Sequence, residues 1–439
     1  MLPIIKKFIP AWLIRLYHFK LAFLSALVYR FPSQKLIVIG VTGTKGKSTT
    51  VALIHQVLAG SGVKVASLSS VAFKIGDEEI PNILKMTMPG RFFVQRFLRR
   101  AVGAGCKYVV IEVTSQGIVQ YRHRFITFDT AVMTNIAREH IEAHGGFEPY
   151  LRAKLDLFWR LSSGATAVIN EDDAQAQRFK SATSAKVVPY GKEGIRFTNE
   201  DLRITNIHIL QDGIKFQLAG EDIQSSLLGG FNLYNILAAC AVGMVYHIPM
   251  EQIAQGIHGV IEVPGRMEFV AREPFCVVVD YAHTPDSLRN VYSFLRESGI
   301  SNFQETISKQ ERKKLICVLG ATGGGRDKWK RPEFGKIAAE FCDKVILTNE
   351  DPYDENPATI IDEIQAGFSQ IPNSKFQILN SEKVLDRREA IRKALKQAKA
   401  HDVVVITGKG AEQWIMGPNG TKEPWDDRKV VAEELKKRV

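Results

Sequence analysis

The residue pattern with the clearest chemistry in this sequence is a glycine-rich loop. The segment GVTGTKGKSTT, residues 40–50, follows the apolar run KLIVI and precedes a helix expected to begin near Ser48. Backbone amides of such a loop and of the helix N-terminus bind phosphate oxygens, and Lys47 adds a charge near the outer phosphates. Five residues, one more than in the ordinary Walker loop, separate Gly40 from Gly46. We predict a nucleotide-binding loop rather than an ordinary turn, with these contacts: Gly43, Thr44, Lys45, Gly46, Lys47, Ser48 and Thr49.

The elements around this loop alternate between short β-branched runs and helical stretches, which is typical of a parallel sheet covered by helices on both faces. The runs are KLIVIGVTG, VKVASLSS, YVVIEVTS, TAVMTNI and ATAVIN. A more antiparallel pattern follows at residues 186–228, and then a buried helix. A second α/β series begins after Val263-Pro264-Gly265. Ligands of such sheets bind at the carboxyl ends of the strands.

We therefore predict the α/β class: a P-loop central domain with a parallel sheet at residues 35–263, and a Rossmann-like α/β domain at 264–439. The 439 residues, 45% hydrophobic and 24% charged, suit a soluble protein of several domains. The net charge of +11 suits an anionic partner. No nucleic-acid-binding motif accompanies it. Five cysteines without paired spacing predict reduced core thiols in a cytoplasmic protein.

Residues 1–34 are predicted to form a basic amphipathic helical segment. Lys6, Lys7, Arg15 and Lys20 interrupt every apolar window long enough to span a bilayer. Tyr29, Arg30 and Phe31 follow the apolar stretch where a signal peptide would have small residues. The segment either packs on a neighbouring domain or partner subunit, or lies at a membrane interface.

The loop TGTKGKST is similar to the ATP loop of the Mur ligase superfamily. Further blocks in the same order resemble the MurE branch, and the resemblance extends from residue 35 to residue 439. These blocks include IEVTSQGIVQYR, TNIAREHIEAHG, YLRAKLDLF, GGFNLYNILAA, DYAHTPDSL and GGGRDKWKRPEFG. The resemblance implies an ATP- and magnesium-dependent ligase that activates a carboxylate as an acyl phosphate before an amine attacks it.

The resemblance also implies roles for single residues. The catalytic set is Lys47, Glu112, His140 and Lys154, and the metal ligands are Ser48, Glu112, His140 and Lys154 as a carbamate. Asn235 matches an adenine contact, Arg266 and Asp280 match ATP contacts, and Lys330 and Arg331 match positions near the phosphates. From the sequence alone, Lys154, between Ala153 and Leu155, would be interpreted as a solvated charge on a helix, and Lys330 and Arg331 could equally be surface charges.

The substrate contacts implied by the resemblance are Thr87, Pro89, Thr114, Ser115, Arg122, Asp351, Tyr353, Arg387, Gly408 and Glu412. This sequence differs from the family pattern in two ways that bear on these contacts. Only about 34 residues precede the ATP-loop strand, so the family's UDP-binding N-terminal domain is expected to be missing. Tyr353 stands where members that add meso-diaminopimelate carry an arginine, and Ala411 replaces a histidine, while Glu412 can still hold an ammonium.

The expected substrates are UDP-N-acetylmuramoyl-dipeptide and a free diamino acid or lysine-like amino acid, in the cytoplasm. One alternative is a ligase for folylpolyglutamate or another γ-linked peptide. The other is a nucleotide-binding assembly subunit that docks through its N-terminal helix on a protein partner or a membrane.

Overall fold

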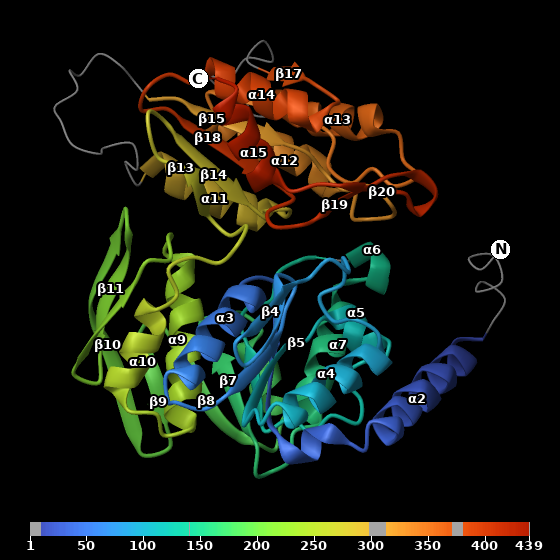
Figure 1. Cartoon of the computed structure of the whole chain (residues 1–439), viewed down its shortest axis with the longest axis vertical. Coiled ribbons are helices and arrows are strands. Elements are labelled where there is room, and N and C mark those ends of the chain that lie inside the picture. The colour runs from blue at the N-terminus through green and yellow to red at the C-terminus, as the bar shows by residue number, and fades with distance from the viewer. Residues whose placement is uncertain (1–9, 140, 298–312, 371–380, 439) are drawn as a thin grey trace.

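The computed structural model describes residues 10–439 except 140, 298–312, 371–380 and 439. Two α/β units lie one against the other (Figure 1). Residues 37–225 supply all strands of a twelve-stranded sheet, and residues 268–407 supply all strands of a six-stranded sheet. The predicted fold class, two α/β units in sequence, is confirmed.

The first sheet has a parallel centre and antiparallel edges. Its order is β12-β11-β10-β9-β8-β7-β6-β1-β5-β2-β3-β4. Strands β2, β5, β1, β6, β7 and β8 pair in parallel, and the remaining pairs are antiparallel. The bounds are β1 Ile37–Thr42, β2 Val65–Leu68, β3 Ala72–Ile75, β4 Glu78–Pro81, β5 Tyr108–Glu112, β6 Thr130–Met133, β7 Thr166–Asn170, β8 Lys186–Gly191, β9 Gly194–Phe197, β10 Glu200–Leu210, β11 Gly213–Leu218 and β12 Glu221–Ser225.

Helices cover both faces of this sheet, so its central strands are apolar on both sides. Alternate residues of β1 illustrate this, since Ile39 and Val41 join one core and Val38 joins the other. The helices of this unit are α3 Lys47–Ala59, α4 Arg91–Gly103, α5 Ser115–Val119, α6 Ile141–His144, α7 Phe147–Trp159, α8 Ala176–Ser181, α9 Phe231–Val245 and α10 Met250–His258.

The second sheet has the order β13-β14-β18-β15-β16-β17, and only β13 runs antiparallel to its neighbour. Its strands are β13 Glu268–Ala271, β14 Cys276–Asp280, β15 Leu315–Leu319, β16 Lys344–Leu347, β17 Ser381–Lys383 and β18 Val403–Thr407. A separate ribbon joins β19 Trp414–Met416 to β20 Lys422–Pro424. The helices are α11 Pro285–Glu297, α12 Lys330–Phe341, α13 Pro357–Gln365, α14 Arg387–Gln397 and α15 Asp427–Lys436.

Helix α2, Ala11–Val28, precedes the first sheet and packs against α4 (Figure 1). Residues 1–9 of the predicted N-terminal segment lie outside the described residues. The described segments of the chain contain no helix that is both long and apolar enough to cross a membrane.

The cysteines differ in part from the prediction of five reduced thiols. Cys317, on β15, and Cys342, directly after α12, form a disulfide. They are 25 residues apart, and the return of α12 against the sheet brings them together, so their spacing gave no sign of pairing. Cys106, Cys240 and Cys276 are free and buried.

Candidate active site

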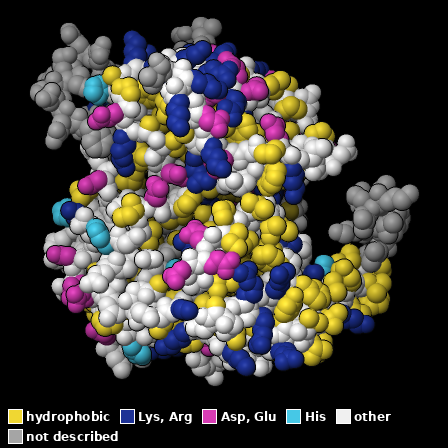
Figure 2. Space-filling view, viewed as in Figure 1, with side chains coloured by type: hydrophobic (Ala, Val, Ile, Leu, Met, Phe, Trp, Pro, Cys, Tyr) yellow, Lys and Arg dark blue, Asp and Glu magenta, His cyan; other side chains and the backbone are white. Residues whose placement is uncertain are grey.

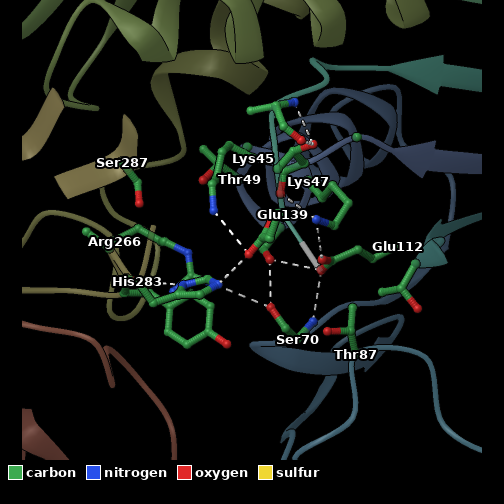
Figure 3. A pocket seen from close by; sticks show the side chains of 18 of the residues that line it. Lys45, Lys47, Thr49, Ser70, Thr87, Glu112, Glu139, Arg266, His283 and Ser287 are labelled. Carbon is green, nitrogen blue, oxygen red and sulfur yellow. Dashed lines mark hydrogen bonds and ion pairs between the residues drawn. The ribbon is translucent and has the colours of Figure 1, made fainter. Parts of the chain in front are cut away.

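A cavity of about 650 Å³ lies between the two units, where the central strands of both sheets end. The first unit contributes the glycine-rich loop, the ends of β2 and β5, and the segment after β4. The second unit contributes Arg266, the end of β14, and residues from the loops after β15, β16 and β18. Figure 3 shows side chains from both units pointing into this space. Its position at the carboxyl ends of parallel strands agrees with the general rule for ligand sites in such sheets.

The glycine loop connects β1 to α3 in a conformation that requires glycine. Gly43 and Gly46 have φ values of 148° and 78°. A Cβ atom at Gly43 would lie 1.9 Å from Oγ1 of Thr134, and one at Gly46 would lie 2.2 Å from Oδ1 of Asn235. Asn135 holds the loop from outside, because its backbone carbonyl accepts from the amide of Thr44 at 2.7 Å. The loop is thus a fixed cradle at the N-terminus of α3, which suits phosphate oxygens.

Oxygen ligands gather beside the first turn of α3. The hydroxyl of Ser48 donates to Oε2 of Glu112 at 2.9 Å and lies 2.7 Å from the hydroxyl of Ser70. Nζ of Lys47 lies 3.9 Å from the other oxygen of Glu112. One carboxylate with hydroxyl groups fits magnesium, which commonly takes one or two protein carboxylates and completes its shell with phosphate oxygens and water.

No group of three or more His, Cys, Asp or Glu side chains that could hold a metal occurs among the described residues. His140, the other predicted ligand, lies outside them. The fit to magnesium therefore rests on Ser48 and Glu112.

Lys154 of α7 projects into the cavity from a buried position. Its Nζ donates to the carbonyl of Gly43 at 2.6 Å and lies 4.8 Å from the centre of the Tyr150 ring. Burial, reinforced by the nearby charge of Lys47, lowers the pKa of Lys154 well below its usual value. The reading of Lys154 as a solvated surface charge is thus excluded.

A chain of polar contacts joins the two units across the cavity (Figure 3). Oε1 of Glu139 lies 3.3 Å from Nζ of Lys45 and 2.9 Å from Nε2 of His283. Burial and the charge of Lys45 lower the pKa of His283 to about 4, so the ring is neutral at physiological pH. Burial likewise lowers the pKa of Lys45 to about 8.

Arg266 and Asp280 of the second unit line the cavity opposite the glycine-rich loop. The guanidinium of Arg266 stacks over the Tyr281 ring at 4.2 Å, and its Nη2 lies 3.5 Å from the Ser70 hydroxyl. The carboxylate of Asp280 accepts from the amides of Met267 and Ala282, at 2.7 and 2.6 Å. Arg266 thus stands opposite the first turn of α3.

A second group of charges closes the far end of the cavity. Asp351 and Glu412, both from the second unit, share two lysines. Lys409 Nζ lies 2.8 Å from Asp351 and 3.0 Å from Glu412, and Lys85, from the first unit, contacts the same two carboxylates. Although burial opposes its ionisation, these two cations hold the pKa of Glu412 well below its usual value.

Most predicted site residues line this one cavity. They are Gly43, Thr44, Lys45, Gly46, Lys47, Ser48, Thr49, Thr87, Glu112, Thr114, Ser115, Arg122, Lys154, Asn235, Arg266, Asp280, Lys330, Asp351, Tyr353, Gly408 and Glu412. Pro89, Arg331 and Arg387 do not line it.

The two arginines are occupied by structural partners instead. Arg387 is buried and forms a two-pronged ion pair with Asp427, at 2.8 and 2.7 Å, in place of the predicted substrate contact. Arg331 is fully buried and pairs with Glu355 and Glu363, at 3.0 and 2.7 Å, in place of the predicted phosphate contact.

Sequence reasoning missed Ser70, Lys85, Glu139 and Lys409, which complete these clusters. Glu139 directly precedes His140 in the block TNIAREHIEAHG, and Lys409 lies between the predicted contacts Gly408 and Glu412, so both are neighbours of residues already singled out. Ser70 and Lys85 follow strand ends and carry no pattern of their own.

The comparisons with known proteins agree with this architecture. The profile of the Mur ligase middle domain matches residues 41–243, and that of the Mur ligase glutamate ligase domain matches residues 265–410. The chain is similar to UDP-N-acetylmuramoyl-L-alanyl-D-glutamate–2,6-diaminopimelate ligases. The protein of this name from Geobacillus kaustophilus is 34% identical over 429 residues, which cover 95% of this chain and 82% of the relative. That from Syntrophomonas wolfei is 36% identical over 427 residues, with the same coverage.

Comparison with solved structures also finds similarity to ligases of this type. The structure of a UDP-N-acetylmuramoyl-L-alanyl-D-glutamate–2,6-diaminopimelate ligase aligns with a TM-score of 0.58 at 29% identity, over 92% of this chain and 79% of that one. A Mycobacterium tuberculosis folylpolyglutamate synthase aligns with a TM-score of 0.70 over 89% and 92% of the two chains, but at 16% identity it shows the fold alone.

The fold and the phosphate loop define an ATP-dependent ligase. The chain belongs to the Mur ligase family, and it is similar to members of the MurE branch.

Proposed function

We propose that this ligase joins an amino acid to a UDP-N-acetylmuramoyl-dipeptide, as a step in making peptidoglycan precursors in the cytoplasm. The observation that carries the proposal is the single cavity in which Lys47, Ser48 and Glu112 face Arg266 of the other unit, with Asp351 and Glu412 at its far end. Such a cavity offers separate places to a triphosphate, a carboxylate and an amine. The names of the relatives supply the substrate class.

The reaction proceeds in two steps. An oxygen of the dipeptide's carboxylate attacks the γ-phosphorus of ATP, so that a C–O–P linkage forms and ADP leaves. The nitrogen of the amino acid then attacks the carbonyl carbon, and the tetrahedral intermediate collapses to the amide. Phosphate leaves with the original carboxylate oxygen, and the amine loses its proton to solvent.

The protein's part in the first step is to bind and orient highly charged groups. The amides of the glycine loop and the ammonium of Lys47 bind the outer phosphates, and Arg266 reaches them from the second unit. Ser48 and Glu112 would hold magnesium, which when bound neutralises charge between phosphates and carboxylate. His140 belongs to the proposed ligand set through the family resemblance.

We also propose that Lys154 acts as a carbamate. An uncharged amine attacks carbon dioxide, forms an N–C bond and releases a proton, and the lowered pKa of Lys154 favours that uncharged form. The product is an anion, which suits a position flanked by the charge of Lys47 better than an ammonium does.

The acidic end of the cavity favours an amino acid with a second ammonium. Asp351, Glu412 and Glu350 are the carboxylates that line it, and the first two already hold ammonium groups of the chain. Since Arg387 is paired with Asp427, we assign the substrate's α-carboxylate to Arg326, which lines the cavity beside Tyr353. Tyr353 replaces the arginine expected for meso-diaminopimelate, so we propose lysine or a similar diamino acid.

Phosphate release from ATP and magnesium tests the proposal. We expect release only when UDP-N-acetylmuramoyl-L-Ala-D-Glu is present with one of lysine, ornithine or diaminopimelate, and amide product by mass spectrometry. Release with a folate and glutamate would assign the alternative ligase activity. Nucleotide binding without turnover on any acceptor would favour the assembly-subunit alternative and contradict the proposal.

A further inference from the structure

Helix α2 carries a large exposed apolar surface. Its outer half consists almost entirely of large apolar side chains that are 38–64% exposed: Trp12, Leu13, Leu16, Tyr17, Phe19, Phe23, Leu24, Leu27 and Val28. At about 100° per residue, these positions share one side of the helix, and Lys20 alone interrupts them. Figure 2 shows the apolar band that they form at the edge of the molecule. A soluble protein rarely exposes such a band without a partner for it.

The inner half of α2 packs against the first unit. Ser25 and Ala26 are buried on the side that packs against α4. At the margin of the outer half, the rings of Phe19 and Phe23 also approach the ring of Phe125 edge-on, with centroids 5.2 and 5.4 Å away. The outer half is therefore presented to the surroundings in a fixed orientation.

The charged residues of α2 and of the neighbouring α4 are all basic. Residues 1–76 contain no Asp or Glu, whereas residues 1–35 contain six Lys or Arg. Of these, Arg15, Lys20 and Arg30 are exposed on or beside α2, and the neighbouring α4 adds exposed Arg96 and Arg99. Aromatic side chains prefer the bilayer interface, and lysine and arginine attract anionic headgroups.

We propose that α2 docks the protein on an anionic lipid bilayer, with the helix parallel to the surface and its outer half at the boundary between headgroups and acyl chains. The long stem of Lys20 lets its ammonium reach the headgroups from within the apolar band. A protein partner is disfavoured because it would have to bury the ammonium of Lys20 together with the neighbouring basic side chains.

A short segment of the first unit connects α2 to the wall of the cavity. Arg91, the first residue of α4, contacts His18 of α2 and donates to the carbonyl of Gln120 at 2.5 Å. It follows closely on Thr87, which lines the cavity. The segment between the cavity and the helix is thus short, and its contacts with α2 are made by side chains of the first unit.

Co-sedimentation of the full chain with vesicles of equal parts phosphatidylglycerol and phosphatidylcholine tests the proposal. We expect binding that Leu16→Glu with Leu24→Glu weakens by roughly a hundredfold, because two charges then replace apolar contacts. The matched control is Ile207→Glu with Ile209→Glu on β10, where the two side chains are 40% and 45% exposed; it should bind like the parent chain. Far-UV circular dichroism and ligase activity without vesicles should be the same for all three proteins.

The contribution of charge is measured in parallel. Arg15→Gln with Lys20→Gln, added salt, or vesicles of phosphatidylcholine alone should each weaken binding. Failure of the parent chain to bind the anionic vesicles would overturn the proposal, as would undiminished binding of the Leu16→Glu, Leu24→Glu protein. Dimerisation that this same variant abolishes, without vesicle binding, would assign the band to a second copy of the chain and also overturn it.

Discussion

Nζ of Lys85 lies 2.6 Å from Oδ2 of Asp351, although the two residues are 266 positions apart and belong to different units. The same ammonium contacts Glu412. Lys85 therefore occupies the place that we assign to the second ammonium of the amino-acid substrate. An incoming diamino acid has to displace it.

Replacing Lys85 by methionine should therefore strengthen binding of a diamino acid. Methionine keeps the length of the side chain and leaves two carboxylates with only Lys409 between them. We expect the KM for lysine to fall by roughly tenfold, which corresponds to about 1.4 kcal/mol, with little change for an uncharged amino acid. Lys74→Met, which removes an exposed pair with Glu79, is the control. An unchanged or higher KM for lysine would show that Lys85 does not compete with the substrate.

Substitution of Glu112 by glutamine should nearly abolish turnover. The variant keeps the shape of the side chain but removes the charge that, with Ser48, we assign to magnesium. We expect kcat to fall by at least about a hundredfold and the magnesium concentration for half-maximal rate to rise. Titration of magnesium against phosphate release measures both, with the exposed Glu79→Gln as control. Parent-like dependence on magnesium would remove Glu112 from the metal site.

Lys154→Ala should also be inactive, but an added small molecule should partly restore its activity. If the working group is a carbamate, a short carboxylic acid placed in the vacated space supplies a similar anion and partly restores turnover. The parent protein should show a carbamate signal by carbon-13 NMR after incubation with labelled bicarbonate, and Lys154→Ala should lack it. Full activity of Lys154→Ala would contradict the assignment.

ATP binding should weaken as the pH rises through about 8. Burial lowers the pKa of Lys45 to about 8, so below that pH its ammonium is present in the free protein and above it is lost. Phosphates favour the charged form, so binding at higher pH must take up a proton, and affinity falls by up to about tenfold per pH unit. Calorimetry in buffers of different ionisation enthalpy measures this proton uptake. Lys45→Met should bind ATP more weakly and without this proton uptake; equal uptake in both proteins would assign it to another group.

The sequence predicted the position of a residue correctly where that position follows from the neighbouring strand or helix. The loop from Gly43 to Ser48 was predictable because an apolar strand before it and a helix after it leave little choice of conformation. The same holds for Glu112, at the end of a wholly apolar strand.

Residues whose role depends on distant partners were not predictable in this way. Lys85 and Asp351 meet only because the two units close on each other, and Cys317 meets Cys342 only through the return of α12. Arg387 illustrates the same limit. The family resemblance implied a substrate contact for it, but the carboxylate that it binds in the structure is Asp427 of its own chain, 40 residues further on.

Arg387→Met distinguishes the structural role from the predicted substrate role. Asp427 is fully buried, and without Arg387 its carboxylate would keep only the indole of Trp425 as a hydrogen-bond donor among the described side chains that contact it. Breaking a buried ion pair from one side costs about 3–5 kcal/mol, so we expect a corresponding loss in the free energy of unfolding of the second unit by chemical denaturation. Arg387→Lys should recover only part of it, because one ammonium cannot replace two parallel N–H donors. A raised KM for the amino acid in a protein of parent-like stability would instead restore Arg387 to the substrate site.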